Sequence, residues 1–580
     1  MAEVDPTPTR VDLYDSTLRD GTQREGIALT VDDKLRVART IDELGVPYIE
    51  GGWPGANPKD TAFFARAKAG ELALERATLV AFGMTRRPNR QAAGDPALTA
   101  LLDAGTDVVC LVGKASALHV TEAIGTTLDE NLAMIADSIR HLRAEGRRVF
   151  FDAEHFFDGH IGNETYALDV LRAAAEAGAE CVVLCDTNGG MLPAHVGAVT
   201  GDVVGMLGGT QIGIHVHNDT ECAVANSLAG LRAGATHVQG TINGVGERCG
   251  NANLCSIIPN LELKWGLDLV GSQRLTQLAR VAHEVAETMN LTPDPHAPYV
   301  GHAAFAHKAG LHASALAKRT DTYQHIEPES VGNSLRMLMS ELAGKSTIVM
   351  KGEQLGLDLG SDGDLVARIL ERVKDLEHAG YSFEAADASF ELLVRDEAAV
   401  AEETFRLEGF RTIVERREDG RPVAEATVRV WVRASAGDDE AVDGWVRKIG
   451  VGEGNGPVDA LDQAFRAAVN GRYPHLARIH LADYKVRIVD PQAGTGATTR
   501  VLISSSDGER EWQTVGVSEN VIDASWKAMA DAYAYGLTNG GPGAPAGASR
   551  GRASAPTAGA VSDRGKTSEG DAVVGHAGSS

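Results

Sequence analysis

Short apolar runs alternate with amphipathic stretches from residue 11 to about residue 260. The apolar runs lie at 11–18, 48–52, 77–83, 107–113, 148–156, 181–186, 212–218 and 237–242. Between them, segments such as 31–45 and 164–178 repeat apolar residues at helical spacing and end in a glycine, which commonly stops a helix. Eight strands that alternate with helices predict a (β/α)8 TIM barrel over residues 11–265. A doubly wound open sheet is the alternative, because periodicity does not show whether a sheet closes.

The pattern changes after the predicted barrel. Residues 266–384 repeat apolar positions mainly at helical spacing and predict helical linker subdomains. A separate α+β domain is predicted over 385–538, with strands at 389–396, 405–417, 425–435, 483–490 and 499–506 and helices at 457–470 and 520–537. Residues 1–10 are expected to be an N-terminal extension, and the Gly/Ala/Ser/Pro-rich residues 539–580 a disordered tail.

Charge and cysteine content narrow the possible functions. The net charge of −25 argues against general affinity for nucleic acid or anionic membranes, since both favour basic surfaces. The six cysteines are scattered and form no CxxC pair, a pattern that indicates reduced thiols. The start of the chain does not resemble a signal peptide, and no apolar run approaches the length of a membrane span. We therefore expect a cytoplasmic protein that binds neither nucleic acid nor membranes.

Polar residues gather where the predicted barrel strands end. Arg19 and Asp20 follow the first strand, Glu154 ends the fifth, Thr187 follows the sixth, and a His-x-His pair ends the seventh. In a TIM barrel the carboxyl ends of the strands meet at one mouth, which is where such enzymes carry out their chemistry. These residues are therefore expected to converge.

The histidine pair, His215 and His217, predicts a metal half-site. Side chains two residues apart on a strand point to the same face, so both imidazoles enter one space. A lone histidine is usually structural, but this pair is followed by Asn218-Asp219 and has Asp20 available across the mouth. Two imidazoles and a carboxylate suit a divalent transition metal, and Mn, Mg, Zn and Co all remain open.

Two further motifs each leave two interpretations. The segment NGVGERCGNAN (243–253) is either a flexible glycine loop or a backbone anion site in which Asn251 is a further metal ligand. Glu154 lies between aromatic pairs in FFDAEHFFDG. It is either a general base whose pKa is raised by apolar neighbours or an ordinary ion-paired or solvated glutamate.

Together, TLRDGTQ (17–23), HVHND (215–219) and NGVGERCGNAN resemble the isopropylmalate synthase-like acyltransferases over about residues 11–540. These enzymes condense acetyl-CoA with a 2-oxo acid on a TIM barrel, and many carry a C-terminal regulatory domain. The segments YIEGGWPGANPKD (48–60) and AEHFFDGH (153–160) resemble the citramalate synthase branch, which implies pyruvate as the second substrate.

The resemblance assigns roles to individual residues. It implies four metal ligands: Asp20, His215, His217 and Asn251. It further implies that Arg19 stabilises the developing alkoxide with support from Gln23, that Thr187 fixes the substrate carboxylate, and that Glu154 acts in acid/base steps.

The segment FAHKAGLHASA (305–315) resembles the linker motif that places a histidine over a partner subunit's active site. His312 is the first candidate for that histidine and His307 the second. Where the family often has Gln-Asp after the histidine, this chain has Ala313-Ser314.

The resemblance also implies a homodimer whose 385–538 domain binds isoleucine as an inhibitor. GNGPVDAL (454–461) resembles that domain's signature, and a glycine loop at 452–456 would offer backbone N–H groups to the ligand. Three other functions remain open. They are a 2-isopropylmalate synthase using 2-oxoisovalerate, a metal-dependent aldolase or lyase on the same barrel, and an amino-acid sensor on an inactive barrel.

Overall fold

The computed structural model describes residues 8–539 except 317, 340–342, 355, 361, 402, 417, 419, 436–440 and 470. Most of the predicted N-terminal extension and all but the first residue of the predicted tail lie outside the described residues. The chain divides into two compact units whose boundary lies near residues 339–348.

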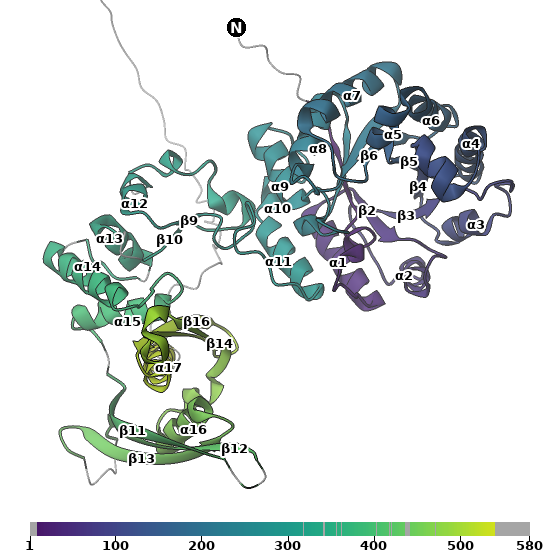
Figure 1. The fold of residues 1–580 in the computed structure, drawn as a ribbon. Coiled ribbons are helices and arrows are strands. Elements are labelled where there is room, and N and C mark those ends of the chain that lie inside the picture. Colours follow the sequence, from purple (N-terminus) through teal and green to yellow (C-terminus); the bar gives the residue numbers. More distant parts are fainter. Residues whose placement is uncertain are drawn as a thin grey trace, which may run out of the picture. The chain divides into compact units, whose positions relative to one another are not determined.

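The first unit is built on eight parallel strands that close into a barrel in sequence order (Figure 1). The strands are β1 (Asp12–Asp15), β2 (Tyr48–Gly52), β3 (Thr78–Met84), β4 (Val108–Lys114), β5 (Arg148–Glu154), β6 (Cys181–Asp186), β7 (Gln211–Val216) and β8 (His237–Gly240). Strand β8 pairs with β1 and completes the barrel. This closure confirms the predicted TIM barrel and excludes the open sheet.

Helices surround the barrel, and their apolar sides join the strands in one large core (Figure 1). They are α1 (Val31–Leu44), α2 (Pro58–Lys68), α3 (Pro96–Asp103), α4 (Leu128–Ala144), α5 (Phe156–Gly162), α6 (Glu164–Glu176), α7 (Pro193–Met206) and α8 (Ala223–Arg232). Local sequence sets the bounds of α1, because Thr30 forms a capping box with Asp33 and Gly45 follows the helix with φ of 96°. The predicted glycine stop is thereby confirmed.

The segment after the barrel is mainly helical, as predicted. It contains α9 (Leu254–Pro259), α10 (Ser272–Leu275), α11 (Leu278–Thr288), α12 (Gly310–Leu316), α13 (Lys345–Gln354) and α14 (Gly363–His378). A short parallel pair, β9 (Ala306–His307) with β10 (Arg336–Met337), interrupts the helices. Short helical elements complete the described chain: η1 (Gly21–Gln23), η2 (His119–Ile124), η3 (Ile242–Gly244), η4 (Asn260–Lys264), η5 (Thr320–Thr322), η6 (Pro328–Val331), η7 (Pro474–Arg478) and η8 (Pro491–Gly496).

The strand predicted at 389–396 is wrong, because these residues belong to helix α15 (Asp387–Glu397). The run SFELLVRD is too short to separate the two periodicities. Its buried residues include Phe390 and Val394, which are four apart and share one helical face.

Two similar halves make up most of the second unit. Strands β11 (Phe405–Arg416), β12 (Pro422–Arg433) and β13 (Trp445–Gly454) form an antiparallel sheet that is followed by α16 (Pro457–Val469). Strands β14 (His480–Ile488), β15 (Thr499–Ser506) and β16 (Glu511–Ser518) repeat this arrangement before α17 (Val521–Asn539). Strands β13 and β16 were not predicted from the sequence.

The glycine loop predicted at 452–456 is largely wrong, because Gly452 and Gly454 belong to strand β13. A Cβ atom at Gly452 would lie 2.4 Å from the backbone nitrogen of Ala464 in α16. The glycines therefore let the helix pack directly against the strand. Gly516 in β16 has the same role, since a Cβ there would lie 2.1 Å from the carbonyl oxygen of Ala524 in α17.

None of the helices in the described ranges combines the length and apolar character that crossing a membrane requires.

Candidate active site

The mouth of the barrel brings Asp20, His215 and His217 together, as predicted. Asp20 Oδ2 lies 3.6 Å from His215 Nε2 and 3.8 Å from His217 Nε2. All three residues are buried, and one ligand atom from each lies within 4.8 Å of the others. The three side chains form a triad that fits a divalent cation.

Asn251 completes a possible ligand set. An isolated β-bridge pairs it with His217, and its Nδ2 donates to Asp20 Oδ1 at 3.1 Å. Its Oδ1 is buried and has no hydrogen-bond partner among the described residues, which leaves an oxygen ready to bind a cation. A Cβ atom at Gly246 would lie 2.2 Å from Asn251 Nδ2, so this glycine permits the close approach of the loop.

Arg19 is held beside the triad by two carboxylates and an aromatic ring. Its Nε donates to Glu50 Oε2 at 2.7 Å and its Nη1 to Asp20 Oδ2 at 2.9 Å. The guanidinium carbon lies 3.9 Å from the centroid of the Phe82 ring. Burial alone lowers the pKa of Arg19, but Glu50 and Asp20 outweigh it and raise the pKa, so the side chain stays charged.

Glu50 belongs to the same site but was not among the residues predicted from the sequence. It is fully buried in β2 and accepts hydrogen bonds from Tyr14 Oη at 2.8 Å, from Ser16 Oγ at 2.6 Å and from Arg19. The available signal was a single carboxylate inside the otherwise apolar strand YIEGG.

Hydrogen bonds inside the barrel set the orientation of the His215 ring. Its Nδ1 lies 2.8 Å from Gln239 Oε1, and Gln239 Nε2 donates to Asp152 Oδ1 at 2.9 Å. Because Asp152 takes the amide hydrogen, the oxygen of Gln239 faces Nδ1 and favours a proton there. Nε2 of His215 is therefore left unprotonated toward Asp20, which suits a metal ligand.

Electrostatics keep the triad in its metal-binding form at neutral pH. Burial raises the pKa of the Asp20 carboxyl, but Arg19 and the two imidazoles outweigh burial and lower it to about 2. Burial, followed by the neighbouring His215, lowers the pKa of His217 to about 4. Burial also lowers the pKa of His215. A carboxylate and two neutral imidazoles therefore face the cation position.

The remaining predicted residues of the barrel line the same cavity, whose volume is about 320 Å3. Glu154 pairs with Lys114, so the ion-paired interpretation of this glutamate is the one that the structure shows. Thr187 Oγ1 accepts a hydrogen bond from the His155 backbone at 2.9 Å. Gln23 is exposed at the rim, and the side-chain hydrogen bonds of Arg19 go to Glu50 and Asp20.

The structure does not bring His312 or His307 into the lining of this cavity. His312 lies in α12, where its ring stacks on Tyr323 with centroids 4.0 Å apart. The ring centroid of His307 lies 6.2 Å from that of His312.

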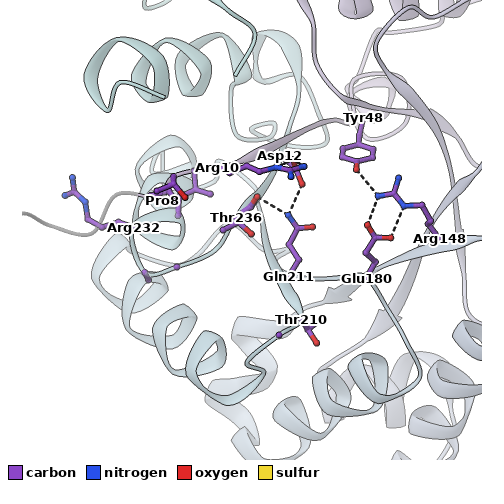
Figure 2. A pocket seen from close by; sticks show the side chains of 15 residues that line it. Pro8, Arg10, Asp12, Tyr48, Arg148, Glu180, Thr210, Gln211, Arg232 and Thr236 are labelled. Carbon is purple, nitrogen blue, oxygen red and sulfur yellow. Dashed lines mark hydrogen bonds and ion pairs between the residues drawn. The ribbon is translucent and has the colours of Figure 1, made fainter. Parts of the chain in front are cut away.

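A larger cavity of about 900 Å3 lies at the opposite end of the barrel strands, where the amino ends meet (Figure 2). Figure 2 shows several of its polar and charged groups bonded to one another. Arg148 pairs with Glu180 and bonds Tyr48, while Gln211 donates to Asp12. These groups are occupied by one another and do not converge on a common point, as reactive groups would.

Comparison with known proteins extends over nearly the whole chain. The chain is 56% identical to an (R)-citramalate synthase from Streptomyces coelicolor, over 91% of this chain and 97% of that protein. It is 48% identical to an (R)-citramalate synthase from Aquifex aeolicus, over 91% and 98% of the two chains. The chain belongs to the (R)-citramalate synthase family. Identity to a 2-isopropylmalate synthase from Methanocaldococcus jannaschii is 28%, over 90% and 94% of the two chains.

Family models divide this citramalate synthase family member into three parts. Residues 10–285 match the HMGL-like family, and residues 299–380 match the homocitrate synthase post-HMGL domain-like family. Residues 384–537 match the LeuA allosteric (dimerisation) domain. The second of these parts contains His312, and the third contains both halves of the βββα repeat.

Proposed function

We propose that the chain condenses acetyl-CoA with pyruvate and water to give (R)-citramalate and CoA, in a metal-dependent reaction that serves isoleucine synthesis in the cytoplasm. The observation that carries this proposal is an intact, buried Asp20–His215–His217 triad in a chain that is 56% identical to an (R)-citramalate synthase. The weaker identity to a 2-isopropylmalate synthase, 28%, favours pyruvate over 2-oxoisovalerate.

The bonds and protons of this reaction balance without an oxidant or reductant. A proton leaves the acetyl methyl group, and the resulting carbon forms a bond to the keto carbon of pyruvate. The keto oxygen gains negative charge and then a proton. Water then cleaves the thioester bond, which releases CoA as a thiol.

Residues of the mouth supply the parts that this reaction needs. Asp20, His215, His217 and Asn251 would hold a divalent cation, which acts as a Lewis acid and as a template for the 2-oxo acid. The fixed guanidinium of Arg19 stabilises negative charge on the keto oxygen. The hydroxyl of Thr187 donates to the carboxylate.

Proton transfers are assigned to groups at the rim of the cavity. Glu154 takes part in acid/base steps, and its pairing with Lys114 holds the carboxylate at the cavity wall. His312 of the partner subunit completes the site, which accounts for its absence from the cavity lining in its own chain. His307 is the second candidate for this role.

A thiol-release assay over a panel of 2-oxo acids tests this function. Purified chain supplied with Mn2+ and acetyl-CoA should release thiol fastest with pyruvate, and the product should be (R)-citramalate. Faster release with 2-oxoisovalerate would instead identify a 2-isopropylmalate synthase. Turnover without acetyl-CoA would indicate an aldolase or lyase, and no turnover with any 2-oxo acid would favour a sensor.

We further propose that the second unit makes the protein a homodimer and binds isoleucine as an inhibitor. Its match to the LeuA allosteric (dimerisation) domain supports both roles. A cavity of about 410 Å3 in this unit presents Asp462 and Arg466 beside Leu481 and Ile503. A carboxylate, a guanidinium and apolar side chains are the groups that an aliphatic amino acid requires.

Truncation tests the regulatory proposal. Isoleucine should inhibit the full chain, and coupling between two such sites usually corresponds to a ~5- to 150-fold change in affinity. A chain ending near residue 385 should keep some activity and lose the inhibition. If isoleucine, leucine and valine all leave the rate of the full chain unchanged, the second unit serves dimer stability alone.

A further inference from the structure

The cavity at the barrel mouth has two chemically different walls. The metal triad and Thr187 lie on a polar wall, which the proposed reaction uses. The other wall, at the ends of β2, β3 and β4, also contains Lys114 but is mainly apolar and includes Trp53, Phe82, Met84 and Val112. No step of the proposed reaction has yet given these apolar side chains a role.

Trp53 follows a turn whose backbone is tightly constrained. Strand β2 has an irregular register between Glu50 and Gly52, and Gly52 has φ of 137°. A Cβ atom at Gly52 would lie 2.6 Å from the Asp60 carboxyl carbon, so no other residue fits there without displacement. The Trp53 backbone nitrogen donates to Asp60 Oδ2 at 2.9 Å. Asp60 in turn pairs with the buried ammonium group of Lys34.

The indole of Trp53 is connected to the proposed reaction centre through a single ring. Trp53 meets Phe82 edge to face, with ring centroids 5.4 Å apart and planes at 82°. The face of Phe82 carries the Arg19 guanidinium at 3.9 Å. Met84 is two residues further along β3 and lies on the same side of the strand as Phe82. The position of this wall relative to Arg19 and Asp20 is therefore fixed by packing.

The bound 2-oxo acid must present its alkyl group to one of these walls. Its carbonyl carbon carries three substituents in a plane: the keto oxygen, the carboxylate and the alkyl group. When both oxygen-bearing substituents face the polar wall, the alkyl group is directed away from that wall. The opposite wall is the one that contains Trp53.

We propose that Trp53 sets the size limit for the alkyl group of the 2-oxo acid, so that a methyl group fits and a branched chain is rejected. This inference rests on the proposed function and specifies its substrate class as short, unbranched 2-oxo acids. A hydrophobic pocket usually discriminates by ~10- to 200-fold for each methylene group. Asp60 fixes the backbone of Trp53 and the Phe82 ring packs against its indole, which makes such a limit effective because a mobile ring would move aside.

The test is the specificity of Trp53→Leu, which keeps the wall apolar and removes most of the ring volume. The kcat/KM values for pyruvate, 2-oxobutyrate and 2-oxoisovalerate are measured by thiol release. The kcat/KM for 2-oxobutyrate divided by that for pyruvate should be at least tenfold higher than in the wild type. The corresponding ratio for 2-oxoisovalerate should rise less. The matched control is Trp265→Leu, since Trp265 follows η4 under Arg232 and does not line this cavity. Its ratios should equal those of the wild type.

Two results would overturn the proposal. In the first, the ratio of kcat/KM values for 2-oxobutyrate and pyruvate is unchanged, while the KM for acetyl-CoA rises with every 2-oxo acid. Trp53 would then contact acetyl-CoA and not the alkyl group of the 2-oxo acid. The other is an unchanged ratio with all constants unaltered. If Trp53→Leu fails to fold, Trp53→Phe applies the same criterion with a smaller expected shift. Failure of the proposed function itself is separate, since it shows as no thiol release by the wild type.

Discussion

The substitution Glu50→Gln probes the least expected part of the active site. The buried carboxylate accepts from Tyr14, Ser16 and the Nε of Arg19, and an amide can satisfy only part of this set. The –NH2 group of glutamine fits best at the Oε1 position, where the Tyr14 hydroxyl can turn to accept from it, so Arg19 would keep only a neutral carbonyl oxygen in place of the carboxylate. The guanidinium would then lose one of its two anionic partners and be held less firmly by Asp20 and the face of Phe82.

The size of the effect follows from these contacts. Removing one partner of a buried ion pair costs about 3–5 kcal/mol when nothing replaces it. Here Asp20 remains as a partner at 2.9 Å, so we expect the smaller cost of an imperfectly satisfied buried donor, about 1–3 kcal/mol of barrel stability. Displacement of Arg19 should lower kcat by ~100-fold, the scale for losing one donor to a developing oxyanion.

Two measurements and one control check this prediction. Thiol release with pyruvate gives kcat, and urea denaturation followed by tryptophan fluorescence gives the stability of the barrel transition. Glu180→Gln is the control, because Glu180 also pairs with an arginine of the same barrel but at the half-exposed opposite end. It should change neither quantity much. A Glu50→Gln protein with wild-type kcat and an unchanged denaturation midpoint would refute the reasoning.

Three further predictions concern the metal triad and Arg19. His217→Ala should weaken Mn2+ binding by more than ~100-fold, because losing even a residue that only orients a metal ligand lowers metal affinity about 10- to 100-fold. Circular dichroism should show that the fold is retained. Normal turnover by metal-stripped wild-type protein would contradict this. Because the pKa of His217 is about 4 and that of Asp20 about 2, Mn2+ binding at pH 7 should release no proton from these groups. Calorimetry at pH 7 in buffers of different ionisation enthalpy should give equal heats of Mn2+ binding. Protonation of His217 should weaken binding as the pH approaches 4, and a loss of affinity already near pH 6.5 would contradict its lowered pKa. Arg19→Lys should lower kcat by ~100-fold while Mn2+ affinity persists, because lysine cannot bridge two oxygens; a near-normal kcat would make Arg19 a structural partner of Asp20.

Much of the fold could be predicted because its signals are local and repeated. Each barrel strand is a short apolar run, and helices such as α1 carry their own cap and glycine stop. The predictions failed where tertiary packing decides the outcome. The run containing Phe390 and Val394 fits both periods, and the packing partner makes it a helix. Strand β13 was missed because Gly452 and Gly454 look like a loop until α16 is placed against them.

The same distinction holds within the active site. The pair His215 and His217 was visible because the two residues lie only two positions apart, at the end of strand β7. Gln239 was not, since its value depends on meeting His215 and Asp152 across the barrel interior. Glu50 was not among the predicted site residues, because its partner Arg19 is 31 residues away in sequence.

The fixed position of Arg19 also has an entropic consequence for catalysis. A free arginine side chain loses about 2 kcal/mol of rotamer entropy when it is confined to one conformation. In this protein Glu50, Asp20 and Phe82 already impose that confinement, so the loss accompanies folding and is absent from substrate capture. Binding energy from the 2-oxo acid is then not consumed in ordering the guanidinium and remains available to lower the barrier of the carbon–carbon bond-forming step.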